Sequence, residues 1–338
     1  MFNKIYNVVK KSIRENFVSI CLYIIVLFII LYPVDYYIIT GGGSFDAKNR
    51  VEIKNAQQSK GSFNMAYVSE MKGTIFTYLL SYIVPSYERE SIEDYQTNDK
   101  ESIEDIEFRN TLWLNETNNS SIYVAYTKAK KEIKIKSAKN YIFYLDEKSK
   151  TNLKIGDEIL SVEDTKIDGI ETLKKKIAEY KEGDKLKIKV KRKKKELERY
   201  AYIYTEENTN YIGISLLEDV IYETNPEVKF HFKKSESGPS GGLIMTLQIY
   251  NMLTKEDITH GKKIVGTGTI TKEGEVGEID GVKYKLKGAV KNKADIFLVA
   301  NGRNYKEATK EKEKNNYKIK IIGVDTFDEA VEKLNNIK

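Results

Sequence analysis

Residues 237–242 read Ser-Gly-Pro-Ser-Gly-Gly and residues 280–285 read Asp-Gly-Val-Lys-Tyr-Lys, and the stretch joining these motifs organises the chain. The first motif places Ser240 at a glycine-rich turn before Gly242–Leu253, a segment apolar nearly all round that predicts a buried helix. Backbone N–H groups at a helix start can face a developing oxyanion, and glycine leaves room for a substrate backbone. Ser240 is therefore a candidate nucleophile, with Gly238 and Gly241 as candidates for contacting the oxyanion or the substrate backbone.

The composition restricts which base could take the Ser240 proton. Only two histidines occur, His231 and His260, and the sole cysteine, Cys21, lies in an apolar run. The sequence has no Cys/His cluster, no H-E-x-x-H and no Walker-A pattern, so we expect no metal, no cofactor and no built-in ATPase. Lysine is the remaining common base, provided that burial lowers its pKa.

Two other interpretations of the serine motif are weaker. A Gly-Pro-Ser-Gly-Gly run is often only a turn. Gly238, Ser240 and Gly242 also fit the nucleophile elbow of α/β-hydrolases. That interpretation requires a downstream Asp and then His, whereas the only later histidine, His260, directly follows the predicted helix.

The lysine motif offers three candidates, Lys283, Lys285 and Lys287. On a helix, Lys283 and Lys285 flank the apolar face on opposite sides, so periodicity does not choose between them. That apolar face consists of Val282, Leu286, Ala289 and Val290.

These motifs resemble the proteolytic domain of the Lon family, and most closely its membrane-anchored branch, the SepM-type proteases, in which a PDZ-like domain precedes a Lon-like domain. The resemblance covers Tyr211–Lys338. It implies that Ser240 is the nucleophile, Lys285 the general base and Thr267 a supporting residue. It rests on five ordered blocks: Gly238-Pro239-Ser240, Leu247-Gln248-Ile249-Tyr250-Asn251, Gly266-Thr267-Gly268-Thr269-Ile270, Gly274-Glu275-Val276-Gly277 and the lysine motif.

The family pattern also selects among the lysines. In the family, the lysine stands four residues after the second glycine of a Gly-Gly turn. The corresponding turn in this sequence is Asp280-Gly281, and the residue four positions after Gly281 is Lys285. This sequence departs from the pattern in having Asp280 for the first glycine, Gly241 where alanine is usual, and Ser237 where ATP-dependent members often carry Asp. None of these departures removes a catalytic group.

The N-terminal region predicts a membrane anchor. Phe17–Tyr32 is an uncharged apolar run, and only Asp35 is charged in the extension to Ile39. About 20 residues span the hydrocarbon core, so we expect a transmembrane helix over residues 17–39 rather than a buried core helix. Lysines and Arg14 precede it, which predicts a cytoplasmic tail over residues 1–16 and extracytoplasmic domains after the helix. No small-residue cleavage site follows, which favours an uncleaved single-pass anchor.

Residues 40–120 are predicted to form a juxtamembrane region with strands and helices. The run Gly41-Gly42-Gly43-Ser44 indicates a flexible joint. Short strands are expected over residues 50–53 and 62–68. Helices are expected over residues 73–84 and 91–115.

Residues 121–207 are predicted to form a PDZ-like α+β domain. Leu153–Val162 resembles the PDZ stretch in which a turn enters a central strand, and residues 170–180 predict an amphipathic helix. Strands are expected over residues 123–126, 132–136, 185–191 and 198–204. The carboxylate-binding loop, expected near residues 140–143, is degenerate. Peptide binding by β-augmentation is one hypothesis, and a domain that only positions the protease is another.

Residues 208–338 alternate strands and helices, which predicts an α/β Lon-type domain with a mixed sheet. The expected function is that of a membrane-anchored, ATP-independent serine endopeptidase with a Ser-Lys dyad, acting on extracytoplasmic peptides or small membrane-associated proteins. A non-enzymatic, membrane-tethered peptide-binding scaffold is the alternative. Related Lon domains form rings, so a homo-oligomer is compatible with the resemblance. A nucleic-acid partner is not expected, because 56 basic residues meet 50 acidic ones and the 191–195 basic run fits a solvated hairpin.

Overall fold

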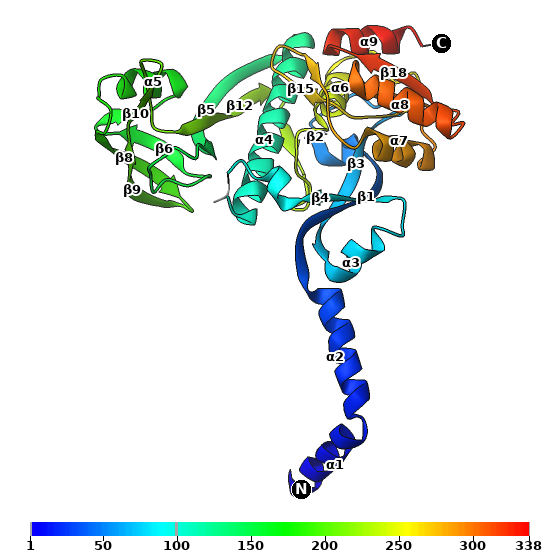
Figure 1. The fold of residues 1–338 in the computed structure, drawn as a ribbon. Coiled ribbons are helices and arrows are strands. Elements are labelled where there is room, and N and C mark those ends of the chain that lie inside the picture. The colour runs from blue at the N-terminus through cyan, green and yellow to red at the C-terminus, as the bar shows by residue number, and fades with distance from the viewer. Residues whose placement is uncertain (1, 99–100, 338) are drawn as a thin grey trace. The chain divides into compact units, whose positions relative to one another are not determined.

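The computed structural model describes residues 2–98 and 101–337. Met1, Asp99, Lys100 and Lys338 lie outside the described residues, so the predicted domains 1–16, 40–120 and 208–338 are each described in part. The chain divides into two compact units (Figure 1). The first comprises Met1–Gly41 and Val68–Tyr95, and the second comprises Gly42–Tyr67 and Gln96–Lys338. Strands β1 (Pro33–Asp46) and β3 (Ser62–Thr74) each run from one unit into the other.

The first unit contains an apolar helix that is shorter than the sequence predicted. Its elements are α1 (Phe2–Glu15), α2 (Phe17–Leu31), α3 (Ile75–Leu80), β4 (Tyr87–Ser91), the 3-10 turn η2 (Ile92–Tyr95) and the adjoining parts of β1 and β3. The predicted helix over residues 17–39 is wrong beyond Leu31. Pro33 disfavours helical backbone at Tyr32, and residues 36–40 instead pair antiparallel with β4.

Among the described residues, no single helix is both long and apolar enough to cross a membrane. Ile5–Glu15 and Phe17–Leu31 meet the criteria for length and apolar content only as a pair, and they are bent by 76°. None of the residues of α2 is buried. The predicted helix over residues 73–84 is likewise reduced to α3, which has a capping box formed by Thr74 and Thr77.

The second unit contains a sheet that is buried on both faces. Its strands run in the order β18-β17-β14-β3-β1, and the pairs among β18, β17, β14 and β3 are parallel. The bounds are β14 (Lys263–Gly266), β17 (Ile296–Ala300) and β18 (Lys320–Val324). All five residues of β17 are buried, as expected of a parallel strand covered on both sides.

Alternate side chains of β17 enter two different hydrophobic cores. Ile296 and Leu298 belong to a core shared with α4 (Ile103–Lys128), α6 (Gly242–Leu253) and α9 (Phe327–Asn335). Phe297 and Val299 belong to a core shared with α7 (Val282–Lys291) and α8 (Arg303–Lys314). Because successive strand residues point to opposite faces, α6 and α7 cover opposite faces of the sheet (Figure 1).

A second sheet in this unit has a hydrophobic core of its own. Its strand order is β12-β5-β6-β8-β9, with β7 beside β6. Leu173 and Ile177 of α5 (Ile170–Ile177) pack into the core with residues such as Ile142 and Ile188. The strands are β5 (Glu132–Leu145), β6 (Glu158–Val162), β7 (Thr165–Lys166), β8 (Lys185–Arg192), β9 (Lys195–Tyr202) and β12 (Ile214–Asn225).

Short elements complete the unit. They are η1 (Ala47–Arg50), β2 (Val51–Ile53), β10 (Tyr204–Glu206), β11 (Thr209–Tyr211), β13 (Val228–Phe230), β15 (Thr269–Ile270) and β16 (Val276–Gly277). Strand β13 pairs with β2, so residues from the predicted juxtamembrane region and from the C-terminal region form one ladder.

The predicted domain boundaries differ from the structure in two places. Tyr123–Tyr126, predicted as a strand, lies in α4, because Val124, Ala125 and Tyr126 are buried against the core of α6. The α/β domain therefore includes α4 and β3 and is not confined to residues 208–338. The small sheet, in turn, extends past residue 207 through β12, which pairs with β5 along its length.

The glycine run at residues 41–43 forms part of β1 rather than the predicted flexible joint. A Cβ at Gly42 would lie 2.0 Å from the backbone oxygen of Tyr67, and a Cβ at Gly288 of α7 would lie 3.0 Å from Gly43 Cα. A Cβ at Gly41 would meet nothing within 4 Å. The glycines at 42 and 43 therefore permit close backbone packing, including the approach of α7 to β1.

This contrast predicts different costs for two neighbouring substitutions. Gly42→Ala should lower the free energy of unfolding by about 1–3 kcal/mol, because its Cβ clashes with backbone. Gly41→Ala should change it by about 0.5 kcal/mol or less. Thermal and denaturant unfolding of the two variants in detergent would test this, and equal stability of both would contradict the close-packed strand.

Candidate functional site

The sequence-predicted catalytic residues meet at the carboxyl end of β14. Thr267 directly follows this strand, Ser240 precedes α6 on one face of the sheet, and Lys285 lies in α7 on the other face. Parallel sheets commonly carry their sites beyond the carboxyl ends of their strands. The fold thus brings together three residues separated by 45 positions in the sequence (240 to 285).

Hydrogen bonds connect the three residues. Lys285 Nζ donates to Thr267 Oγ1 at 3.2 Å, and Thr267 Oγ1 donates to the backbone oxygen of Ser240 at 2.9 Å. The same oxygen accepts the N–H of Gly268 at 2.8 Å. Thr267 is itself anchored by its N–H, which donates to Leu298 of β17. Thr267, at the end of β14, therefore contacts both the turn that carries Ser240 and the side chain of Lys285.

The structure separates the three candidate lysines by environment. Lys285 is 4% exposed, and its neighbours in the sequence, Tyr284 and Leu286, are also buried. Lys283 is half-buried, with its Nζ 4.7 Å from the centre of the Tyr284 ring, and Lys287 forms an ion pair with Glu311 at 3.3 Å. Of the three, only Lys285 makes a described hydrogen bond to Thr267.

The turn before α7 is held by the N-terminus of α8, an element that the sequence analysis missed. Gly281 adopts a left-handed conformation, with φ 74°. The fully buried Asn304 donates to the backbone oxygen of Ile279 and accepts its N–H, both at 2.8 Å. Arg303 pairs with Asp280 at 3.0 Å, and this hydrogen bond raises the pKa of the guanidinium. Asp280 thus fits where the family has glycine, because its exposed side chain has a partner.

The serine turn is held by α4, whose role was also missed. Gly238, at φ +84°, donates its N–H to the backbone oxygen of Asn110 at 3.2 Å. Ser121 Oγ donates to the oxygen of Gly242 at 3.2 Å, and a Cβ at Gly242 would lie 2.7 Å from Thr117. The run of Asn, Ser and Thr over residues 115–121 is the sequence signal of a helix packed closely against backbone. Since the Gly238 N–H is already bonded, Gly238 supports the turn rather than offering that donor to an oxyanion.

Gly241, the first residue beyond Ser240, leaves room for Met65 of β3. A Cβ at this position would lie 1.8 Å from Met65 Cε, the mobile end of that side chain. Met65 therefore occupies the space that the alanine of the family pattern would need.

Both histidines lie outside the serine site. His231 Nε2 lies 3.0 Å from a Glu52 carboxylate oxygen, across the β13–β2 pair. His260 sits at φ +49° in the turn after α6, with its N–H donating to Asp257. Neither makes a described hydrogen bond to Ser240, so the described contacts do not supply the Ser-His arrangement of an α/β-hydrolase.

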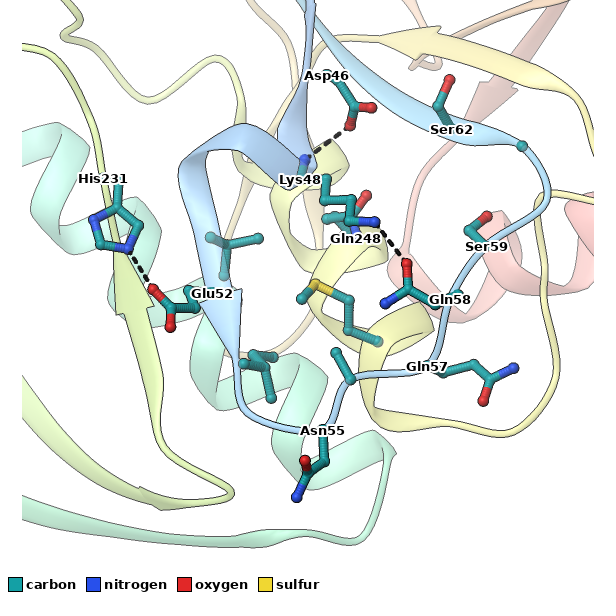
Figure 2. A pocket seen from close by; sticks show the side chains of 15 residues that line it. Asp46, Lys48, Glu52, Asn55, Gln57, Gln58, Ser59, Ser62, His231 and Gln248 are labelled. Carbon is teal, nitrogen blue, oxygen red and sulfur yellow. Dashed lines mark hydrogen bonds and ion pairs between the residues drawn. The ribbon is translucent and has the colours of Figure 1, made fainter.

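A cavity of about 560 Å³, with both polar and apolar lining residues, opens on the second half of α6 (Figure 2). Gln248 is 4% exposed, lines this cavity, and makes no side-chain hydrogen bond with another described residue. The chain segment 55–61 forms one wall, where Lys48 Nζ donates to Gln58 at 2.7 Å. The buried amide of Gln248 is thus available to a polar ligand. No group of three or more His, Cys, Asp or Glu side chains among the described residues could hold a metal ion.

Asp257 fixes that wall to the end of α6. It accepts hydrogen bonds from Ser59 Oγ at 2.9 Å and from the Lys60 N–H at 2.7 Å. Burial raises the pKa of Asp257, but hydrogen bonds from Thr259, Lys60 and Ser59 outweigh it and lower the pKa to about 2. The folded-state pKa is depressed, so this contribution to stability is present above about pH 4 and is lost as the pH falls towards 2.

Comparisons with known proteins identify the central module. Residues 147–199 match the family described as PDZ domain. Among solved structures, the chain is similar to the PDZ domain of an SdrC-like protein from Listeria monocytogenes, at 23% identity over 23% of this chain and 86% of that chain, with a TM-score of 0.21. No curated protein matches the sequence. A PDZ domain is therefore present, and it contains β6, β7, α5 and β8.

The expected position of the carboxylate-binding loop is wrong. Residues 140–143 lie in β5, where Tyr141 pairs with Leu217 on one side and with Glu158 on the other. A strand paired on both sides has no free N–H row to receive a carboxylate.

The contact between α8 and the lysine turn predicts a specific weakness. Asn304→Ala should lower the free energy of unfolding by about 1–3 kcal/mol, because it leaves the buried N–H and oxygen of Ile279 unpaired. Asn315→Ala, at the exposed end of the same helix, is the matched control and should cost less than about 1 kcal/mol. Urea unfolding measures both, and equal costs would show that Asn304 does not brace this turn.

Proposed function

We propose that the chain is a membrane-anchored, ATP-independent serine endopeptidase of the Lon-like type, in which Ser240 is the nucleophile and Lys285 the general base. The observation that supports it most is the buried lysine, joined through Thr267 to the backbone of the serine turn by hydrogen bonds of 3.2 and 2.9 Å. Burial disfavours the ammonium form of Lys285, and the neutral amine is the form that accepts a proton.

The proposed reaction is acyl transfer in two stages. The Lys285 amine takes the proton of Ser240 Oγ as this oxygen bonds to the scissile carbonyl carbon. The carbonyl oxygen becomes an oxyanion that faces the N–H groups at the start of α6. When the tetrahedral species collapses, the C–N bond breaks, and the Lys285 ammonium gives its proton to the leaving amine.

The second stage returns the enzyme to its starting form. Water attacks the acyl carbon while Lys285 takes one of its protons, and Ser240 Oγ leaves and regains a proton from the ammonium. Thr267 positions the lysine, because its hydroxyl accepts from Nζ while donating to the serine backbone. The PDZ domain would present peptide or protein substrates, and α2, with no buried residue, would insert in the membrane.

Substitutions at the site test the assignment of roles. Ser240→Ala and Lys285→Ala should each reduce peptide cleavage by a factor of about 10³ or more, because both groups act in the same step. Lys283→Ala is the matched control and should retain activity, since that side chain lies beside Tyr284. Cleavage of a fluorogenic peptide library by protein in detergent, with thermal unfolding as the check on folding, provides the measurement. Full activity of Lys285→Ala would overturn the proposal.

The same mechanism predicts how the rate depends on pH. Acid protonates the lysine and removes its ability to accept the serine proton, so kcat/KM should rise with pH and fall about tenfold per pH unit on the acid side. As a control, the variants His231→Gln and His260→Gln should keep the same dependence of kcat/KM on pH, which would exclude histidine as the cause of the decrease in acid. A rate that stays level from pH 5 to pH 10 would argue against lysine as the base.

A non-enzymatic, peptide-binding scaffold is the second candidate, favoured by the PDZ match at residues 147–199. A fluorophosphonate probe separates the two functions. Covalent labelling that is lost in Ser240→Ala supports the peptidase, whereas peptide binding without labelling supports the scaffold.

A further inference from the structure

A second cavity, of about 370 Å³, lies between the start of α5 and strands β5 and β12 of the second sheet. It is lined by Asn140 of β5, by Leu216 and Glu218 of β12, and by the chain segment 168–172 at the start of α5. The strand register explains this lining. Asn140 pairs with Glu218 and Ile142 with Leu216, and the side chain of Ile142 is in the core with α5. Residues two apart share a face, so Asn140 and Glu218 point to the helix side of the sheet.

The cavity borders an edge where a further strand can add. Strand β12 is the last strand of its sheet, with β5 as its partner among the described strands. PDZ domains bind extended peptides by adding a strand to an exposed sheet edge, with side-chain pockets providing the specificity. A peptide added along residues 214–218 of β12 would place alternate side chains towards α5 and the cavity.

The charges that line this cavity are all negative. Asp168, Glu171 and Glu218 contribute carboxylates, and none of the described lining residues is basic. Glu171 is paired with Lys174 at 3.2 Å, and Asp168 accepts a hydrogen bond from the Thr172 hydroxyl. Glu218 is exposed and makes no described ion pair, so its carboxylate is accessible to a ligand.

A buried amide provides an independent sign of a ligand site. Asn140 is 5% exposed, lines the cavity, and makes no side-chain hydrogen bond with another described residue. Buried polar side chains are almost always paired, so an amide left unpaired at a cavity wall is suited to a ligand donor. The Asn140 side chain lies on the same face as Glu218, and an amide oxygen and a carboxylate can together accept from one ammonium or guanidinium group.

We propose that this cavity binds a lysine or arginine side chain of an extended peptide that adds as a strand to the free edge of β12. The ligand is an internal basic segment rather than a carboxyl terminus, because the carboxylates that line the cavity repel a terminal carboxylate. This inference deepens the peptide-binding part of the proposed function and names its ligand chemistry. Leu216 and Ile170, the apolar lining residues, contact the methylene stem of the bound side chain.

The test measures binding without cleavage, using the full-length Ser240→Ala chain in detergent. The probes are fluorescein-labelled peptides of alternating Val and Thr that differ only in a central Lys, Gln or Glu, each made as the free acid and as the amide. Fluorescence anisotropy should show the Lys peptide binding about fivefold or more tighter than the Glu peptide, with the amide at least equal to the acid.

Two substitutions on one strand locate the effect. Glu218→Gln should weaken the Lys peptide about threefold or more and leave the Gln peptide unchanged. Glu223→Gln removes the same charge from β12 outside the cavity lining and should change neither. Equal affinity for the three peptides, preference for the free acid, or no binding of any of them overturns the proposal.

The outcome is separable from that of the peptidase. If the wild-type chain cleaves peptides irrespective of their charge, the peptidase stands and this inference fails. If the Lys peptide binds selectively but the fluorophosphonate probe does not label Ser240, the cavity assignment stands and the peptidase fails.

Discussion

The candidate site depends on the burial of one amine where helices from opposite faces of a sheet meet. Lys285 is 4% exposed, and its Nζ donates a hydrogen bond to the Thr267 hydroxyl. The Thr267 hydroxyl orients the Lys285 side chain by this bond and adds no charge of its own. Strand β14 ends at Gly266, and the next residue, Thr267, keeps its N–H bonded to Leu298 of β17 while its side-chain hydroxyl contacts both Lys285 and the Ser240 backbone.

Each half of the site is held by a helix that contributes no reacting group. On the serine side, α4 supplies the Asn110 oxygen and the Ser121 hydroxyl. On the lysine side, α8 supplies Asn304, which satisfies both polar groups of Ile279. These contacts fix backbone, not side chains. The geometry of the site is therefore set by the packing of whole helices. The close approach of α7 to β1, at Gly288 and Gly43, likewise fixes the position of the helix that carries Lys285.

The sequence predicted those parts of the structure that local patterns determine. The apolar run Gly242–Leu253 is α6, the lysine helix is α7, and the PDZ helix and hairpin lie where periodicity placed them, in agreement with the family match at residues 147–199. The family pattern also chose Lys285, which periodicity left open. The role of Tyr123–Tyr126 and the packing of the glycine run depended on distant partners, α6 and the Tyr67 backbone. Pro33 was visible in the sequence and should have ended the predicted apolar helix.

Helix α4 connects the two modules of the second unit physically. Asn119 donates to Asp219 of β12 at 3.1 Å, and the rings of Tyr123 and Tyr222 lie 6.0 Å apart, while the same helix holds Gly238 and Gly242 beside the serine. Its 26 residues extend about 39 Å. Thr117, Ser120 and Ser121 are buried on it, so sliding this helix would leave polar groups unpaired. Through these contacts α4 packs against both β12 and the serine turn, so the position of each depends on the same helix.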